Sequence, residues 1–239
     1  MIIGGYILFH LIKLELRKHK LGWFIKGAII ANIVILGLLC MITFEQIMEG
    51  EESFQSFADY SMVAGTMVRG VFVVFASVLI SKVIIDEFKN RTALVLFSYP
   101  IDRKKIMSAK IVLIFIMTFV TLIISNLFVI LSFLGLNQVF HLTIEMNVTI
   151  NQFRSELLNI LVFNVATAGA SLVPLYFGMR NYSTPATIGS SLLIVMIMCS
   201  SIGTDFSLAN IIYIPITLTI VAIGIVNMTI RKMDSIDLQ

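Results

Sequence analysis

The sequence predicts an all-α integral membrane protein with six transmembrane helices, and its composition and its apolar runs support that prediction. Of its 239 residues, 58% are hydrophobic and 13% are charged, whereas a soluble globular chain has about 45–50% and about 25%. So few charged side chains cannot cover a water-exposed surface around so much apolar material. A helix needs about 20 apolar residues to cross the bilayer core, and six runs are long enough: residues 22–44, 62–85, 107–134, 157–178, 186–204 and 209–230.

The segment before the first run predicts an amphipathic helix over residues 5–20 that lies at the membrane surface. Its basic side is attracted to anionic lipid headgroups. The basic cluster comes late and the next apolar run has no small-residue cleavage site, so we expect an anchor rather than a cleaved signal peptide. The apolar side of this helix holds Ile7, Leu8, Leu11 and Ile12, and the basic side holds His10, Lys13, Arg17 and Lys20.

The six runs show no strong strand-like alternation, and in lipid each must satisfy its own backbone hydrogen bonds, so we expect each to be a helix. The third run is long enough to tilt or to extend beyond the bilayer. Residues 86–106 form a charged loop between the second and third runs. Residues 135–156 mix apolar and polar side chains and predict a short interfacial or re-entrant piece on the opposite side. The chain is therefore predicted to be a single transmembrane domain over residues 1–239.

The positions of the basic residues predict that both termini lie in the cytoplasm. With six spans the two termini share one side, and of the 17 Lys and Arg residues only Arg69 and Arg154 fall on the other side. The first loop on that other side is acidic. Because cytoplasmic loops carry the excess of Lys and Arg, the chain is expected to be a multi-pass protein of the cell membrane with its basic side inward.

The polar residues inside the predicted spans are mostly uncharged. No Asp, Glu or His lies deep within any run, although ion-coupled transporters usually place such groups at membrane depth. The amides either form hydrogen bonds between helices or line a path for a substrate. On the second interpretation, the candidate path residues are Arg69, Asn126, Asn159 and Asn164.

Arg69 lies about a third of the way into the second run, where a charge is costly. Its side chain either snorkels to the outer headgroups, or contacts an acidic partner such as Glu45 or Asp59, or contacts a substrate. The sequence leaves these alternatives open.

The sequence does not indicate a catalytic or metal site. Glu51 and Glu52 resemble the paired glutamates of membrane-embedded CAAX-type proteases, but they fall in an external loop and the expected arginine is missing. The three histidines are too dispersed to build a zinc site. The chain also lacks the phosphate-binding loop of an ATPase, so we expect no cofactor bound by this chain, no ATP hydrolysis by the chain alone, and no nucleic-acid partner.

The residues of the charged loop follow an ordered pattern. An acidic segment ends the preceding helix, an apolar stretch and a proline follow, and a helix begins again in a basic segment. In this pattern the chain resembles the ABC-2 type permeases, whose first cytoplasmic loop runs E-x-x-x-G-T, a leucine-rich stretch, P-x-x-R, an aliphatic residue and a lysine. Arg91 stands where the family's glycine is common. The matching residues are Glu87, Thr92, Leu94, Leu96, Pro100, Arg103, Ile106 and Lys110.

The resemblance implies that this loop forms a coupling helix, which docks on a separate nucleotide-binding ATPase subunit that carries ATP and Mg. An apolar anchor with a charged rim is the usual anatomy of such an interface, and here the rim would include Glu87. A second permease copy, identical or related, and membrane lipids are the other implied partners, in a bacterial plasma membrane. The residues expected to couple to the ATPase are Glu87, Arg91, Thr92, Leu94, Leu96, Phe97, Pro100 and Arg103.

Small permeases of this shape resemble exporters of hydrophobic or amphipathic peptides of the antimicrobial type, so a peptide is the expected cargo. Two other functions remain open. One is a membrane interaction or immunity protein without transport, and the other is an intramembrane hydrolase. Co-purification with an ATPase subunit separates the first alternative from a permease.

Overall fold

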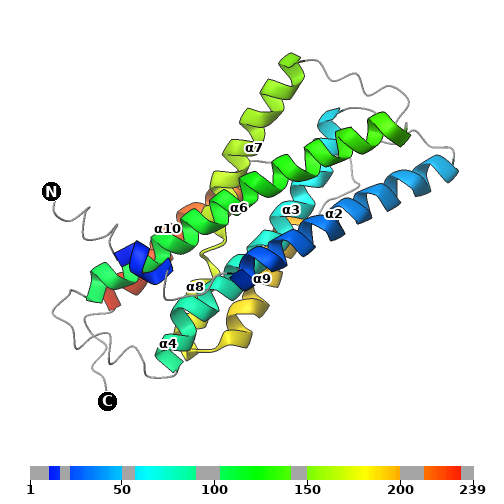
Figure 1. Ribbon diagram of the computed structural model, residues 1–239. Helices are drawn as coiled ribbons and strands as arrows, with labels where there is room; N and C mark the ends of the chain where they lie inside the picture. Colours follow the sequence, from blue (N-terminus) through cyan, green and yellow to red (C-terminus); the bar gives the residue numbers. More distant parts are fainter. Residues whose placement is uncertain are drawn as a thin grey trace.

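The computed structural model describes residues 11–16, 22–49, 57–89, 103–140, 150–199 and 213–232, and all regular structure within these ranges is helical (Figure 1). The predicted all-α class is confirmed. A short helix covers residues 11–16, and the longer elements are α2 (Gly22–Glu49), α3 (Phe57–Ile80), η1 (Ser81–Ile85), α4 (Asp86–Lys89), α6 (Arg103–Phe140), α7 (Ile150–Ala170), α8 (Pro174–Asn181), α9 (Thr184–Cys199) and α10 (Tyr213–Lys232).

The helices have the length and hydropathy of membrane spans. Within the described ranges, four helical runs are long and apolar enough to cross a bilayer: Gly22–Glu45, Phe57–Lys89, Lys104–Gln138 and Glu156–Arg180. Two shorter apolar helices, Thr184–Cys199 and Ile216–Arg231, accompany them. These lengths agree with an integral membrane protein, as the composition predicted.

Helix α3 is the central element of the bundle. It packs against α2, α6, α7 and α9. In the most apolar 18-residue stretch of the run Phe57–Lys89, 67% is buried inside the bundle, whereas the corresponding share for Gly22–Glu45, which is most of α2, is 28%. Tyr60 of α3 stacks on Phe133 of α6 with ring centroids 4.1 Å apart. By contrast, α2 leaves large aliphatic side chains such as Ile29 and Ile30 exposed, which is the surface expected to face lipid.

The contact between α7 and α10 depends on a small residue. Thr219 of α10 donates a hydrogen bond from its hydroxyl to the carbonyl oxygen of Ala166, 2.6 Å away. The same threonine lies directly against Gly169, where a β-carbon would collide with it. Small residues at such positions let two membrane helices approach closely.

The run predicted over residues 157–178 falls within the membrane-length helical run Glu156–Arg180, which has a local irregularity in its middle. Helix α7 ends at Ala170 and α8 begins at Pro174. Between them the N–H groups of Leu172 and Val173 donate to carbonyls three residues back, which is the tighter 3₁₀ pattern. Pro174 has no N–H to donate, so one hydrogen bond of the α-helical ladder is missing there, although Val173 before it keeps helical backbone angles.

Several predictions fall partly or wholly outside the described residues. These are most of the 5–20 helix, residues 90–102 of the charged loop, residues 141–149 of the outer segment and the ends of the last two runs. Helix α3 does continue through η1 and α4 to Lys89, as the loop pattern predicted.

Candidate functional site

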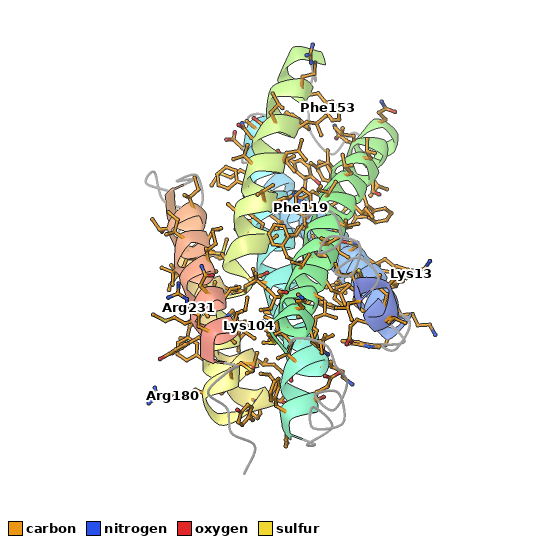
Figure 2. The ribbon with its side chains drawn as sticks, turned by 90° about the vertical axis from the view of Figure 1, so that its left-hand side faces the viewer. Lys13, Lys104, Phe119, Phe153, Arg180 and Arg231 are labelled. Carbon is orange, nitrogen blue, oxygen red and sulfur yellow. The ribbon has the colours of Figure 1, made fainter. Side chains whose placement is uncertain are left out.

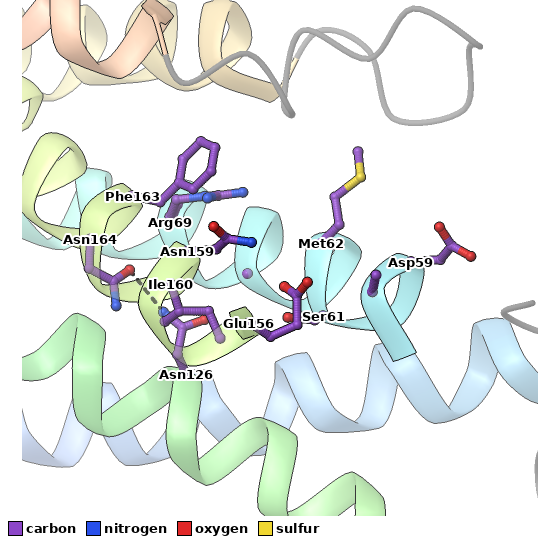
Figure 3. Close-up of a pocket in the computed structure, with 12 residues that line it drawn as sticks. Asp59, Ser61, Met62, Arg69, Asn126, Glu156, Asn159, Ile160, Phe163 and Asn164 are labelled. Atoms are coloured by element: carbon purple, nitrogen blue, oxygen red, sulfur yellow. Dashed lines mark hydrogen bonds between the residues drawn. The ribbon is translucent and has the colours of Figure 1, made fainter. Parts of the chain in front are cut away.

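A polar cavity of about 140 Å³ lies between α3 and α7, with Asn126 of α6 forming part of its wall (Figure 3). All four residues predicted as a possible substrate path line it, although they come from three helices: Arg69, Asn126, Asn159 and Asn164. The structure therefore brings together side chains that are up to 95 residues apart in the sequence.

The floor of the cavity is a pair of buried amides. The Asn126 Nδ2 group donates to Asn164 Oδ1 at 3.1 Å and to the carbonyl oxygen of Leu122 at 3.0 Å. Both asparagines are at most 2% exposed. Asn126 Oδ1 and Asn164 Nδ2 have no hydrogen-bond partner among the described residues. A buried polar atom without a partner costs free energy.

Arg69 supplies the positive charge of the cavity. Arg69 is only 9% exposed, so the surrounding helices cover most of its side chain. Its Nη2 donates to the Thr66 hydroxyl at 2.9 Å, and its Cζ lies 4.7 Å from the centre of the Phe163 ring. The second contact is a cation–π interaction.

Two carboxylates, Asp59 and Glu156, also line the cavity. Sequence reasoning considered Asp59 only as a partner for Arg69 and missed Glu156 as a cavity residue. A helical periodicity was available as a signal, because Glu156, Asn159 and Phe163 follow one another at spacings of three and four residues, which places them on one face of α7. In Figure 3 the labelled Glu156 and Asn159 side chains approach the same space as Asn126 and Arg69.

A second cluster lies at the α4 end of the bundle and centres on Lys110 of α6. Its Nζ is 2.7 Å from Glu87 Oε2, 3.1 Å from Glu15 Oε1 and 3.2 Å from the carbonyl oxygen of Val83. A lysine ammonium has three donors, so this geometry uses all of them. We call this cluster the Lys110 junction, and it joins the 11–16 helix, α4 and α6.

The Lys110 junction corrects one prediction and extends another. Glu87 is 8% exposed and faces Lys110, so it does not form an exposed charged rim. Glu87 and Lys110 are also the first and last residues of the loop pattern, and the structure brings them into contact. Arg103 begins α6, while Arg91, Thr92, Leu94, Leu96, Phe97 and Pro100 lie outside the described residues.

Helix α4 is held on its other side by the turn between α8 and α9. Phe88 stacks on Tyr182 with ring centroids 5.5 Å apart and an interplanar angle of 12°. The Thr184 hydroxyl donates to Asp86 Oδ1 at 3.3 Å. Helix α4, which leads into the charged loop, is therefore held between α6 on one side and the turn between α8 and α9 on the other.

The long apolar helices and the polar cavity between them define a multi-pass, all-α integral membrane protein. The sequence also matches the family model for ABC-2 family transporter protein over residues 11–197. The chain therefore belongs to the ABC-2 transporter family and is a membrane subunit of an ATP-binding cassette transporter, as the loop pattern predicted.

The chain has a relative of nearly equal length. The uncharacterized protein YcbO of Bacillus subtilis (strain 168) is 42% identical over 228 residues, which cover 95% of this chain and 99% of the relative. No solved structure matches the chain. Family membership implies a partner subunit that binds ATP.

Proposed function

We propose that this chain is the permease half of an exporter that moves a hydrophobic or amphipathic peptide out of the cell. A separate subunit hydrolyses the ATP, and two copies of the permease, identical or related, complete the pathway. One observation supports this proposal above the others: the helical run Phe57–Lys89 lines the cavity at one end and leads into the charged loop at the other. A push on the loop is thereby carried by a continuous helix to the cavity.

The orientation that export requires is supported by the distribution of charge. Lys13, Lys104, Arg180 and Arg231 lie in the lower half of the bundle in Figure 2, and Phe153 lies at the opposite end. Since the basic end of a membrane protein faces the cytoplasm, this proposal puts α4 and the Arg103 end of α6, which border the charged loop, on the side where ATP is available.

A peptide cargo is supported by the chemistry of the cavity. Its lining combines the apolar side chains Ile160 and Phe163 with amides, one buried cation and the carboxylates of Asp59 and Glu156. An amphipathic chain matches such a wall better than a small inorganic ion, which would leave the apolar groups unused.

The proposal is tested by reconstitution. The chain is co-expressed with a candidate nucleotide-binding ATPase subunit, purified as a complex and placed in liposomes with a fluorescent amphipathic peptide. We expect ATP-dependent movement of the peptide, and none from the chain alone or with an ATPase whose phosphate-loop lysine is replaced. Failure of any ATPase subunit to co-purify, or transport by the chain alone, would contradict the proposal.

A further inference from the structure

We propose that the π-helical turn η1 is a register switch that sets the position of α4, and with it the start of the charged loop. In the register that the structure shows, η1 contains one residue more than an α-helical turn. In the second register the same segment is a regular α-helix, and α4 is turned by about 100° and advanced by about 1.5 Å. The proposal concerns a helix of this chain alone and does not depend on the cargo.

The wide turn lies in the middle of an otherwise regular helix. Within η1 (Ser81–Ile85) the backbone bond is longer than in an α-helix, because the Asp86 N–H donates to the Ser81 carbonyl five residues earlier. An α-helix closes this bond over four residues. Ile84 and Ile85 are fully buried, so the turn lies inside the bundle rather than at a frayed helix end. Such isolated π-turns are rare and are frequently found at functional sites.

The wide turn is held in its register from both sides of the helix. Lys110 Nζ donates to the carbonyl oxygen of Val83, inside the turn, at 3.2 Å. A side chain that enters the backbone ladder in this way is one of the identifiable causes of helix distortion. On the other side, Phe88 of α4 stacks on Tyr182 of the α8–α9 turn. Because Phe88 follows η1, this stack fixes the register that the extra residue produces.

The residues around the turn can exchange places with their neighbours in the sequence. Without the extra residue, each place in α4 is taken by the preceding residue of the chain. Asp86 then takes the place of Glu87 opposite Lys110, and one carboxylate replaces another. Ile84 takes the place of Ile85, and both are buried isoleucines. The ion pair of Lys110 is therefore re-formed, rather than lost, when α4 turns.

The contacts with the α8–α9 turn do not survive the exchange. In the second register Glu87 takes the place of Phe88, so the ring stack on Tyr182 is lost. The hydrogen bond from Thr184 is lost as well, because an isoleucine takes the place of Asp86. The α8–α9 turn therefore selects the register. While it contacts α4 the π-turn persists, and when it moves away α4 can turn with its buried charges still paired.

Distances between spin labels, measured by double electron–electron resonance on the full chain in detergent, test the switch. The two free cysteines are first removed by Cys40→Ala and Cys199→Ala. One label replaces Lys89, which is exposed at the end of α4, and the second replaces either Lys104 of α6 or Arg180 of α8, both exposed. Two reference helices are used so that a turn of α4 changes at least one distance. A turn of about 100° on a helix of radius about 5 Å moves the label by about 8 Å.

Removal of the aromatic stack should populate the second register. We expect Tyr182→Ala to add a second label position, displaced by about 8 Å. Tyr176→Ala, which removes another partly exposed tyrosine of α8, is the matched control and should leave the distances unchanged. Deletion of Ile84 removes the extra residue while the residues of α4 keep their places. In that background Tyr182→Ala should leave the distances unchanged.

Two charge variants test the exchange of carboxylates in the Tyr182→Ala background. Glu87→Gln should increase the population of the second register, because only there does Lys110 keep a charged partner in α4. Asp86→Asn should decrease that population, because it removes the carboxylate that serves the second register. The opposite order of the two populations overturns the exchange.

The remaining outcomes decide whether η1 switches at all. Unchanged distances in both Tyr182→Ala and Thr184→Val overturn the proposal and leave the π-turn as a fixed feature of the fold. A displacement that persists after deletion of Ile84 also overturns it, because the movement then does not come from the extra residue. If Tyr182→Ala fails to fold, Thr184→Val takes its place, since it removes only the hydrogen bond to Asp86.

Discussion

Replacing Lys110 with methionine is expected to destabilise the protein strongly, because the Lys110 junction is buried. Lys110 is 3% exposed and lies within 3.1 Å of two carboxylates, those of Glu15 and Glu87. Methionine fills a similar volume but leaves both carboxylates without their cation. Removing one partner of a buried ion pair costs about 3–5 kcal/mol. For a chain of this length the melting temperature should then fall by roughly 6–20 °C.

The assay is thermal unfolding in detergent, followed by circular dichroism at 222 nm. Lys13→Met is the matched control, because Lys13 is an exposed lysine of the 11–16 helix that also carries Glu15, and surface changes usually stay within about 0.5 kcal/mol. A triple variant, Lys110→Met with Glu15→Gln and Glu87→Gln, removes all three charges and should recover most of the loss. A Lys110→Met variant that melts with the control, or a triple variant no more stable than the single one, would refute the ionic account.

Two further changes test the coupling segment and the helix packing. Leu96→Asp should abolish ATP-dependent transport in liposomes while membrane insertion stays intact, because it places a charge in the apolar anchor of the proposed ATPase interface; unchanged complex formation and transport would contradict this role. Gly169→Val should cost about 1–3 kcal/mol in thermal unfolding through overpacking, because Thr219 occupies the space beside Gly169. Gly37→Val is its control, since nothing lies within 4 Å of a β-carbon there, and equal melting of the two variants would count against the α7–α10 contact.

The sequence predicted the features of the fold that depend on composition along the chain. Apolar runs identified membrane helices because the bilayer imposes the same requirement on every span. The local 3₁₀ turn around Pro174 was not predicted although proline was its visible signal, because proline is tolerated in membrane helices when other groups satisfy the backbone. Hydropathy alone does not indicate where such a turn lies.

The candidate site was predictable in residue type but not in pairing. Arg69 and the amides were identifiable because charged and polar groups are rare at membrane depth. That Asn126 contacts Asn164, and that Arg69 contacts Phe163, depends on how α3, α6 and α7 are rotated against one another. The Lys110 junction was missed for the same reason, since Glu15 and Lys110 are 95 residues apart and nothing in their spacing indicates that they meet.

The two clusters are mechanically related through α3. From Arg69 to Glu87 the chain is helical throughout, so 18 residues at about 1.5 Å each separate them by about 27 Å. Helix α4 is held by Lys110 on one side and by Tyr182 and Thr184 on the other. Because both contacts belong to neighbouring helices, a force on the charged loop cannot bend α4 alone without breaking a buried ion pair. A displacement of α3 together with its neighbouring helices costs less free energy, and it changes the wall of the Arg69 cavity.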